Sequence, residues 1–137
     1  MSAPIAVDER TEWLEADGQG GFASGTTAGP RTRRYHALLL AATTPPTGRM
    51  VLVNGIDAWI EPDTGSAPEF LTRQRYAPGV LAPEDGAVLE GFADEPWPTW
   101  TFRLRDGTRI EQELFVPHGL PLVAIRWRVS ERRGPVT

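Results

Sequence analysis

A short stretch of the chain carries side chains that could take part in chemistry, directly before an apolar run. Its members are Thr32, Arg33, Arg34, Tyr35 and His36. A guanidinium can donate several hydrogen bonds in a fixed plane to a carboxylate or to ligand hydroxyls. We therefore expect the two arginines either to clamp the neighbouring loop or to reach a ligand or a neighbouring domain.

Catalytic and metal sites have little support around His36. A Ser-His-Asp triad could combine Ser24 with His36, but Ser24 does not stand in a Gly-x-Ser-x-Gly turn. His36 and His118 are the only histidines and there is no cysteine, so a three-ligand metal centre would need carboxylates from distant positions. We expect no catalytic residue, no metal and no cofactor in this chain.

A glycine-rich segment precedes these residues, with glycines at 18, 20, 21, 25 and 29. It lacks the Gly-Lys-Ser/Thr of a phosphate-binding loop, because the chain has no lysine. It also lacks the helix that follows a dinucleotide-binding turn, since Gly29 is followed by Pro30. Gly20 and Gly21 then either serve turns or let the backbone approach a ligand.

Two of the five tryptophans, Trp97 and Trp100, lie in the proline-rich stretch EPWPTW. Indole rings can stack on the apolar faces of sugar rings, but they are also large core residues. Core or loop packing is the favoured interpretation for both. Sugar binding remains the alternative.

The elements that must position these residues are expected to be strands. The 14 glycines and 13 prolines divide the chain into short segments, and no window shows helical periodicity. The expected strands are 12–15, 35–42, 50–53, 56–60, 88–92, 99–104, 109–116 and 122–129. Asn54-Gly55 and Asp106-Gly107 are typical of two-residue hairpin turns.

Alternation supports an antiparallel sheet around the second turn. Residues 102–105 and 110–115 alternate apolar with charged side chains, and opposite charges could pair across the solvent face of this hairpin. In the last run Ile125, Trp127 and Val129 alternate with two arginines, which predicts that Trp127 is in the core. We expect an all-β, antiparallel and incomplete β-sandwich. Its open edge at 122–129 predicts self-association.

Composition limits the function classes. A chain of 137 residues is sufficient for one core, and its net charge of −4 gives no reason to expect nucleic acid. The longest apolar run is too short to cross a membrane, and the N-terminus has no apolar signal core. A cytoplasmic location with no membrane partner is the expectation.

The segment from Glu12 to Ala42 resembles the opening of the N-terminal domain of bacterial and archaeal glycogen debranching enzymes, the amylo-α-1,6-glucosidase family. The shared pattern is Glu-Trp-Leu, Gly-x-Gly-Gly, Ser-Gly-Thr and Thr-Arg-Arg-Tyr-His. PPTGRMVLVN, FADEPWPTWTF and HGLPLVAIRWRV resemble later strands and turns of that domain. Ala37 stands where the family often has glycine. The expected division is a tail at 1–11 and the domain at 12–137, truncated at its C-terminal end.

The resemblance implies a galactose-mutarotase-like supersandwich that precedes a helical-barrel glucosidase domain, which is absent here and would carry the general acid and base. This chain alone would then be inactive, with glycogen or another α-glucan and the C-terminal glucosidase domain as partners. The residues expected to bind substrate or to dock are Gly20, Gly21, Ser24, Thr32, Arg33, Arg34, Tyr35, His36, Trp97 and Trp100. The alternative is a stand-alone carbohydrate-binding or protein-interaction module.

Overall fold

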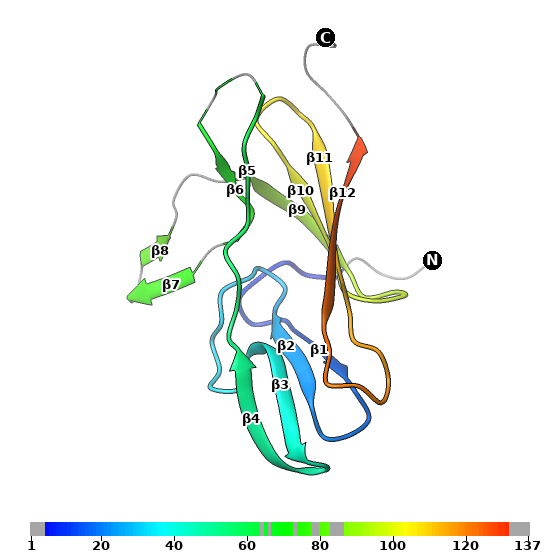
Figure 1. The fold of residues 1–137 in the computed structure, drawn as a ribbon. Helices are drawn as coiled ribbons and strands as arrows, with labels where there is room; N and C mark the ends of the chain where they lie inside the picture. Colours follow the sequence, from blue (N-terminus) through cyan, green and yellow to red (C-terminus); the bar gives the residue numbers. More distant parts are fainter. Residues whose placement is uncertain are drawn as a thin grey trace.

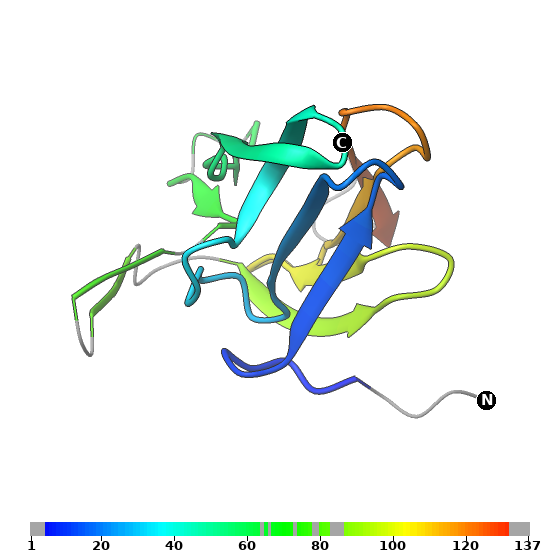
Figure 2. The same cartoon turned by 90° about the horizontal axis from the view of Figure 1, so that it is seen from below.

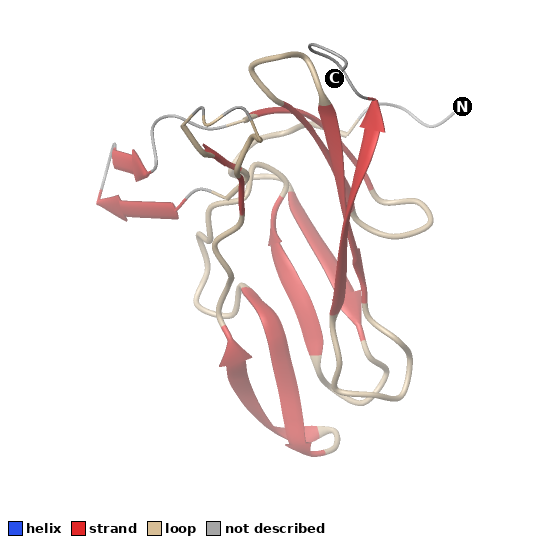
Figure 3. Ribbon diagram, turned by 45° about the horizontal axis from the view of Figure 1, so that its top comes forward, coloured by secondary structure: helices blue, strands red, loops and turns tan. Residues whose placement is uncertain are grey.

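A computed structural model of the protein describes residues 5–63, 65, 67–72, 74–77, 80–82 and 87–131. Every regular element in this part of the chain is a β-strand (Figure 3). The first four strands are β1 (Glu12–Ala16), β2 (Phe22–Thr26), β3 (Ala37–Thr44) and β4 (Thr47–Val53). Four short strands follow, β5 (Trp59–Ile60), β6 (Glu69–Phe70), β7 (Gln74–Ala77) and β8 (Val80–Ala82). The last four are β9 (Val88–Ala93), β10 (Thr99–Arg103), β11 (Arg109–Phe115) and β12 (Ala124–Glu131).

The chain forms two antiparallel four-stranded sheets, each from one continuous segment. The first sheet has the order β1-β2-β3-β4 and the second the order β12-β11-β10-β9. The two sheets lie one above the other, with the short pairs β5-β6 and β7-β8 to one side (Figures 1 and 2). Neither sheet closes into a barrel. The expected all-β, antiparallel sandwich-like fold is confirmed.

Two tryptophans join the sheets at the centre of the core. Trp13 of β1 and Trp100 of β10 meet edge to face, with ring centroids 5.2 Å apart. Trp100 is 5% exposed and donates from Nε1 to the carbonyl oxygen of Thr27 at 3.1 Å. The core continues over the second sheet, where Phe102, Ile110 and Leu114 are also buried. These residues follow the two-residue period of strands that bury one face.

One expected hairpin is present and the other is not. β10 and β11 form a hairpin around Asp106-Gly107, but the loop is longer than the expected two-residue turn, since Arg103 is the residue that pairs with Arg109. Gly107 takes a φ of 88° that favours glycine. The Asn54-Gly55 hairpin was a wrong prediction, because β4 ends at Val53 and β5 pairs with β6. β2 was missed. Its small residues suit an inner strand here, since Gly25 lies directly under the Trp13 indole, where a Cβ would meet Nε1 at 3.2 Å.

The charged residues on the outer face of the second sheet pair differently from the expectation. Within the β10–β11 hairpin, Arg103 lies opposite Arg109, a like-charged pair, and both guanidiniums bind Glu90 on β9. Opposite charges instead face each other between β11 and β12. Arg126 binds Glu113, with Nε 2.6 Å from Oε2, and Arg128 binds Glu111.

The prediction that Trp127 is a core residue was wrong. Trp127 points to the core side of the second sheet but is 41% exposed, and Val129 on the same face is 56% exposed. β12 is an edge strand, as expected for this part of the chain, and of its side chains only Ile125 packs against the core cluster. A side chain on the inner face of a strand is buried only where a second layer covers it.

Candidate functional site

A hollow of about 480 Å³ lies on the first sheet at the Glu12 end of β1. It gathers Ser24, Arg33, Arg34, Tyr35 and His36, all of which the sequence marked as candidates. The structure adds residues from β1 and β2 that sequence reasoning had not selected for a site. These are Glu12, Trp13, Leu14 and Phe22.

His36 is the centre around which the loop before β3 is folded. Its side chain is buried, and Nδ1 accepts hydrogen bonds from the backbone N–H groups of Thr32 at 3.1 Å and Arg33 at 3.2 Å. The N–H of His36 returns to the carbonyl oxygen of Arg33 at 3.1 Å. Because Nδ1 is an acceptor, the network assigns the ring proton to Nε2. The loop is thereby held in one conformation.

Glu12 joins β1 to this loop through a single carboxylate oxygen. Oε1 accepts from His36 Nε2 at 2.7 Å and from Arg33 Nε at 2.5 Å. The hydrogen bond from His36, and next the one from Arg33, lower the pKa of the Glu12 carboxyl because both stabilise its ionised form. Glu12 is therefore ionised at neutral pH, and it lines the hollow.

These contacts exclude His36 as a general base in this conformation. Both ring nitrogens are engaged, one by backbone donors and the other by Glu12. The Ser24 hydroxyl donates to the carbonyl oxygen of Tyr35 at 3.3 Å, so it is bound to the backbone rather than to the imidazole. Among the described residues no group of three or more His, Asp or Glu side chains could hold a metal ion. The contacts of Glu12, Ser24 and His36 therefore hold the loop before β3 in place.

The side chains that this framework presents to solvent include Arg34, Tyr35 and Leu14, besides Arg33 in its ion pair with Glu12. Tyr35 is 56% exposed and Leu14 is 58% exposed. The guanidinium carbon of Arg34 lies 5.6 Å from the Tyr35 ring centroid, a cation–π arrangement. Thr32 is exposed as well, and it contributes its backbone N–H to the loop rather than a side-chain contact to the hollow.

Gly20 and Gly21 lie in the turn at the other end of β1, which for a strand of this length is roughly 13 Å from Glu12. Gly20 has a φ of 96° and lies under Pro46, whose carbonyl oxygen a Cβ would meet at 2.6 Å. A Cβ on Gly21 would meet the buried Asp17 carboxylate at 2.4 Å. Asp17 Oδ1 accepts from the backbone N–H of Gly21 at 3.0 Å. Gly20 thus packs against the β3–β4 turn, and Gly21 packs against Asp17 within the β1–β2 turn.

The two candidate tryptophans have separate positions outside this hollow. Trp100 is enclosed between the sheets, where no sugar could stack on it without opening the core. Trp97 is partly buried and packs edge to face on Phe115 at 5.4 Å. Its buried Nε1 has no hydrogen-bond partner, and the ring lines a hollow of about 230 Å³ beside Glu113 and Arg126.

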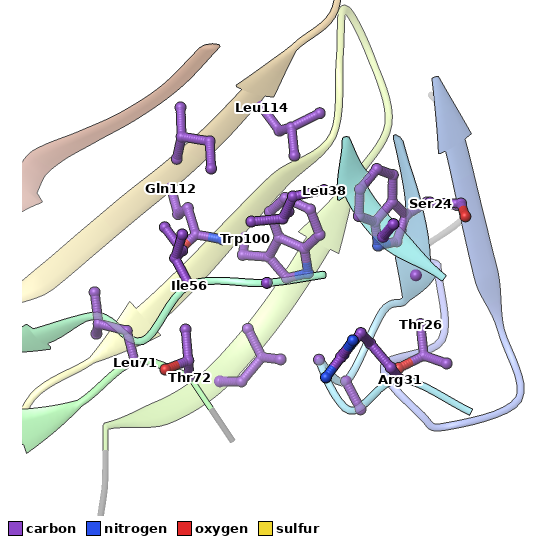
Figure 4. A pocket seen from close by; sticks show the side chains of 18 of the residues that line it. Ser24, Thr26, Arg31, Leu38, Ile56, Leu71, Thr72, Trp100, Gln112 and Leu114 are labelled. Carbon is purple, nitrogen blue, oxygen red and sulfur yellow. The ribbon is translucent and has the colours of Figure 1, made fainter. Parts of the chain in front are cut away.

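A third cavity, of about 90 Å³, lies between the two sheets (Figure 4). Apolar side chains such as Leu38, Ile56 and Leu114 line most of it, and Gln112 and Thr72 add polar atoms. Gln112 Oε1 already accepts from Trp127 Nε1 at 2.9 Å. This cavity is a gap in core packing rather than a gathering of reactive groups.

Among the site residues that sequence reasoning missed, Glu12 is the one that binds the loop before β3. The sequence does place Glu12 and Leu14 on the same face of a strand, which is a signal for a shared surface. Its partners are 21 and 24 positions away, beyond a turn and a strand that the sequence did not reveal. Only the pairing of β1 with β2 brings the carboxylate to the loop.

Comparison with protein families gives one match: the family described as "Glycogen debranching enzyme N terminal" matches residues 11–137. Comparison with curated proteins and with solved structures gives no match. Within the described residues no helix exists that is long and apolar enough to cross a membrane.

Proposed function

Because the chain belongs to the glycogen debranching enzyme N-terminal family, we propose that it serves such an enzyme as a non-catalytic domain that binds α-glucan and docks on a helical-barrel glucosidase domain. The observation that carries this proposal is the rigid loop of Thr32 to His36. Its backbone is held by hydrogen bonds to the buried side chain of His36, while Arg34 and Tyr35 are presented outward. A cytoplasmic location stays a prediction.

The chemistry of the hollow suits a sugar chain. One face of the Tyr35 ring can stack on the apolar face of a glucose unit while Arg34 lies over the other face of the ring. The second oxygen of Glu12 and the remaining donors of Arg33 can bind neighbouring hydroxyls, as planar charged groups do. Since the loop is already ordered, binding would cost little conformational entropy.

Affinity electrophoresis in gels containing glycogen tests the glucan part of the proposal. We expect retardation of the 137-residue chain, and a loss of about tenfold in affinity in Tyr35→Ala and in Arg34→Ala. Trp59→Ala is the matched control, because Trp59 is 49% exposed and lies outside the hollow. Migration unaffected by glycogen would refute glucan binding. We expect no hydrolysis of a branched dextrin by this chain.

Docking is favoured by a separate observation, the exposure of Leu14 beside the arginines. An apolar residue surrounded by charged groups is typical of interface centres. Mixing the chain with a separately produced debranching-enzyme glucosidase domain should give a complex in size-exclusion chromatography. Leu14→Asp should abolish the complex, whereas Leu120→Asp, which changes another exposed leucine, should not. Equal behaviour of the two variants would refute docking through this surface.

A further inference from the structure

The Asn54-Gly55 pair lies in the connection between β4 and β5 and is not part of a hairpin. Both residues are exposed, and residues 54–58 have no regular secondary structure. Within the described ranges, neither the side chain of Asn54 nor the N–H of Gly55 has a hydrogen-bond partner. The side-chain carbonyl carbon of Asn54 and the backbone nitrogen of Gly55 are therefore free to approach each other.

An asparagine followed by glycine can react with its own backbone when both groups are free. The deprotonated nitrogen of Gly55 attacks Cγ of Asn54 and forms a cyclic succinimide, while the side-chain nitrogen takes up a proton and leaves as ammonia. Water then opens the ring at either carbonyl and gives aspartate or isoaspartate. One water is consumed, and an amino group is replaced by a hydroxyl. Glycine favours the attack because it has no Cβ to obstruct it.

The Asp17-Gly18 pair could form the same ring, but the fold holds its carboxyl in place. Asp17 is 3% exposed, and its Oδ1 accepts hydrogen bonds from the backbone N–H groups of Gln19 at 2.7 Å and Gly21 at 3.0 Å. Attack by the nitrogen of Gly18 would require the carboxyl to leave both donors. This pair is therefore protected in the folded state.

The Asp106-Gly107 pair is protected in a different way. The N–H of Gly107 donates to the carbonyl oxygen of Leu104 at 3.0 Å, and Asp106 Oδ1 accepts from the N–H of Thr108 at 2.8 Å. The hydrogen bonds from Thr108 lower the pKa of the Asp106 carboxyl, and an ionised carboxylate is a poor target for a nucleophile. Asp85-Gly86 lies outside the described residues.

We propose that Asn54-Gly55 is a site of spontaneous deamidation, with water as the co-reactant and aspartate or isoaspartate as the product. Asn54 is the single asparagine of the chain, so no second asparagine competes with it. The product adds one negative charge, and isoaspartate also adds a methylene to the backbone between β4 and β5. Asn54, Gly55 and Ile56 line the cavity between the two sheets, so the change falls on the wall of that cavity. The proposal is independent of glucan binding.

Incubation of the 137-residue chain in mildly alkaline buffer tests the proposal. Isoelectric focusing should show a new species with one added negative charge, and mass spectrometry should show the replacement of an amino group by a hydroxyl. Peptide mapping should place the change at Asn54, in two peptides of equal mass and different retention. The rate should rise with pH, because the attacking nitrogen must be deprotonated. A chain that stays unmodified, or a change that maps to another residue, would overturn the proposal.

Two variants are the matched controls. Asn54→Gln adds a methylene to the side chain, so the ring would be larger and slower to form, and the acidic species should not appear. Gly55→Ala should slow the reaction several-fold. The fold can accept this alanine, because Gly55 is not among the described glycines that take a positive φ. An acidic species that forms equally fast in Asn54→Gln would contradict the assignment.

An unfolded sample tests the part of the proposal that comes from the structure. In urea the wild type should deamidate at a rate within a few-fold of the folded rate, since the connection needs no unfolding to react. Isomerisation of Asp17, which is held by its hydrogen bonds, should appear in urea and not in the folded chain. Folded protein that deamidates far more slowly than the unfolded protein would show that Asn54-Gly55 is protected and would overturn the proposal.

Discussion

His36 stabilises the loop before β3 as an acceptor, which is a testable property of one atom. His36→Leu removes the partner of two backbone N–H groups, and we expect the free energy of unfolding to fall by about 2–4 kcal/mol. His36→Asn can place its Oδ1 near the former Nδ1, so its loss should be smaller by about 1 kcal/mol. Urea denaturation measures both. Equal losses in the two variants would contradict the acceptor role.

Glu12, which binds His36 and Arg33, makes the stability of the folded state depend on pH. Because His36 and Arg33 hold the pKa of Glu12 below its usual value of 4.5, the ionised carboxyl stabilises the folded state. This contribution is complete above the unfolded-state pKa and is lost as the pH falls through the folded-state pKa. The melting temperature of the wild type should therefore exceed that of Glu12→Gln at pH 7, and the difference should shrink below about pH 4.5.

Arg33→Gln is the matched variant for this pH profile. It leaves the hydrogen bond from His36 to Glu12, which is the larger cause of the lowered pKa, and removes the smaller one. Its thermal stability between pH 7 and pH 3 should vary less than that of the wild type and more than that of Glu12→Gln. A difference between wild type and Glu12→Gln that stays constant with pH would show that the carboxylate contributes nothing through its charge.

At the scale of elements, β2 can lie beside β1 because its small residues leave room for the Trp13 indole. Gly25→Ala would bring a Cβ within 3.2 to 3.4 Å of three atoms of that indole, and the ring cannot move without disturbing Trp100. We expect a loss of about 1–2 kcal/mol. Gly91→Ala, in β9, meets nothing within 4 Å and should be neutral or slightly stabilising. Thermal melts compare the two, and equal effects would refute the steric explanation.

The strands that could be predicted are those whose own residues show a strand pattern, either a continuous apolar run, as in β3, or alternation. β10, β11 and β12 have a two-residue apolar period, and Asp106-Gly107 marks the turn between the first two. β2 could not be predicted, since Ser24 and Gly25 have low strand propensity and the reason for its strand lies in Trp13, on another segment.

The candidate site could be predicted only in part, for a similar reason. Arg34 and Tyr35 are adjacent in sequence, so their types alone indicated a polar, aromatic surface. The role of His36 depends on Glu12, which reaches it only after β1 and β2 pair. The exposure of Trp127 was not predictable either, because alternation shows which face a residue occupies and not whether a second layer covers it.

At the scale of the whole molecule, the two sheets are separate meanders joined through their facing side chains. Residues 12–53 form one sheet and residues 88–131 the other, so no strand hydrogen bonds link them. Trp100 supplies one link, through its ring contact with Trp13 and its hydrogen bond to Thr27. The backbone N–H of Gly119, before β12, supplies another by donating to the carbonyl oxygen of Asp17, after β1, at 2.6 Å. Cooperative unfolding of the protein therefore depends on the contacts between the two sheets.

The same substitution at two tryptophans tests that dependence. Trp100→Phe removes the hydrogen bond to Thr27 and part of the contact with Trp13, and should lower the free energy of unfolding by about 1–3 kcal/mol. Trp97→Phe removes an indole N–H that is buried without a partner, so its cost should be smaller. Denaturation followed by far-UV circular dichroism and by tryptophan fluorescence should give coincident transitions in the wild type. If Trp97→Phe proved the more damaging change, the two sheets would be held together by something other than the Trp13–Trp100 contact.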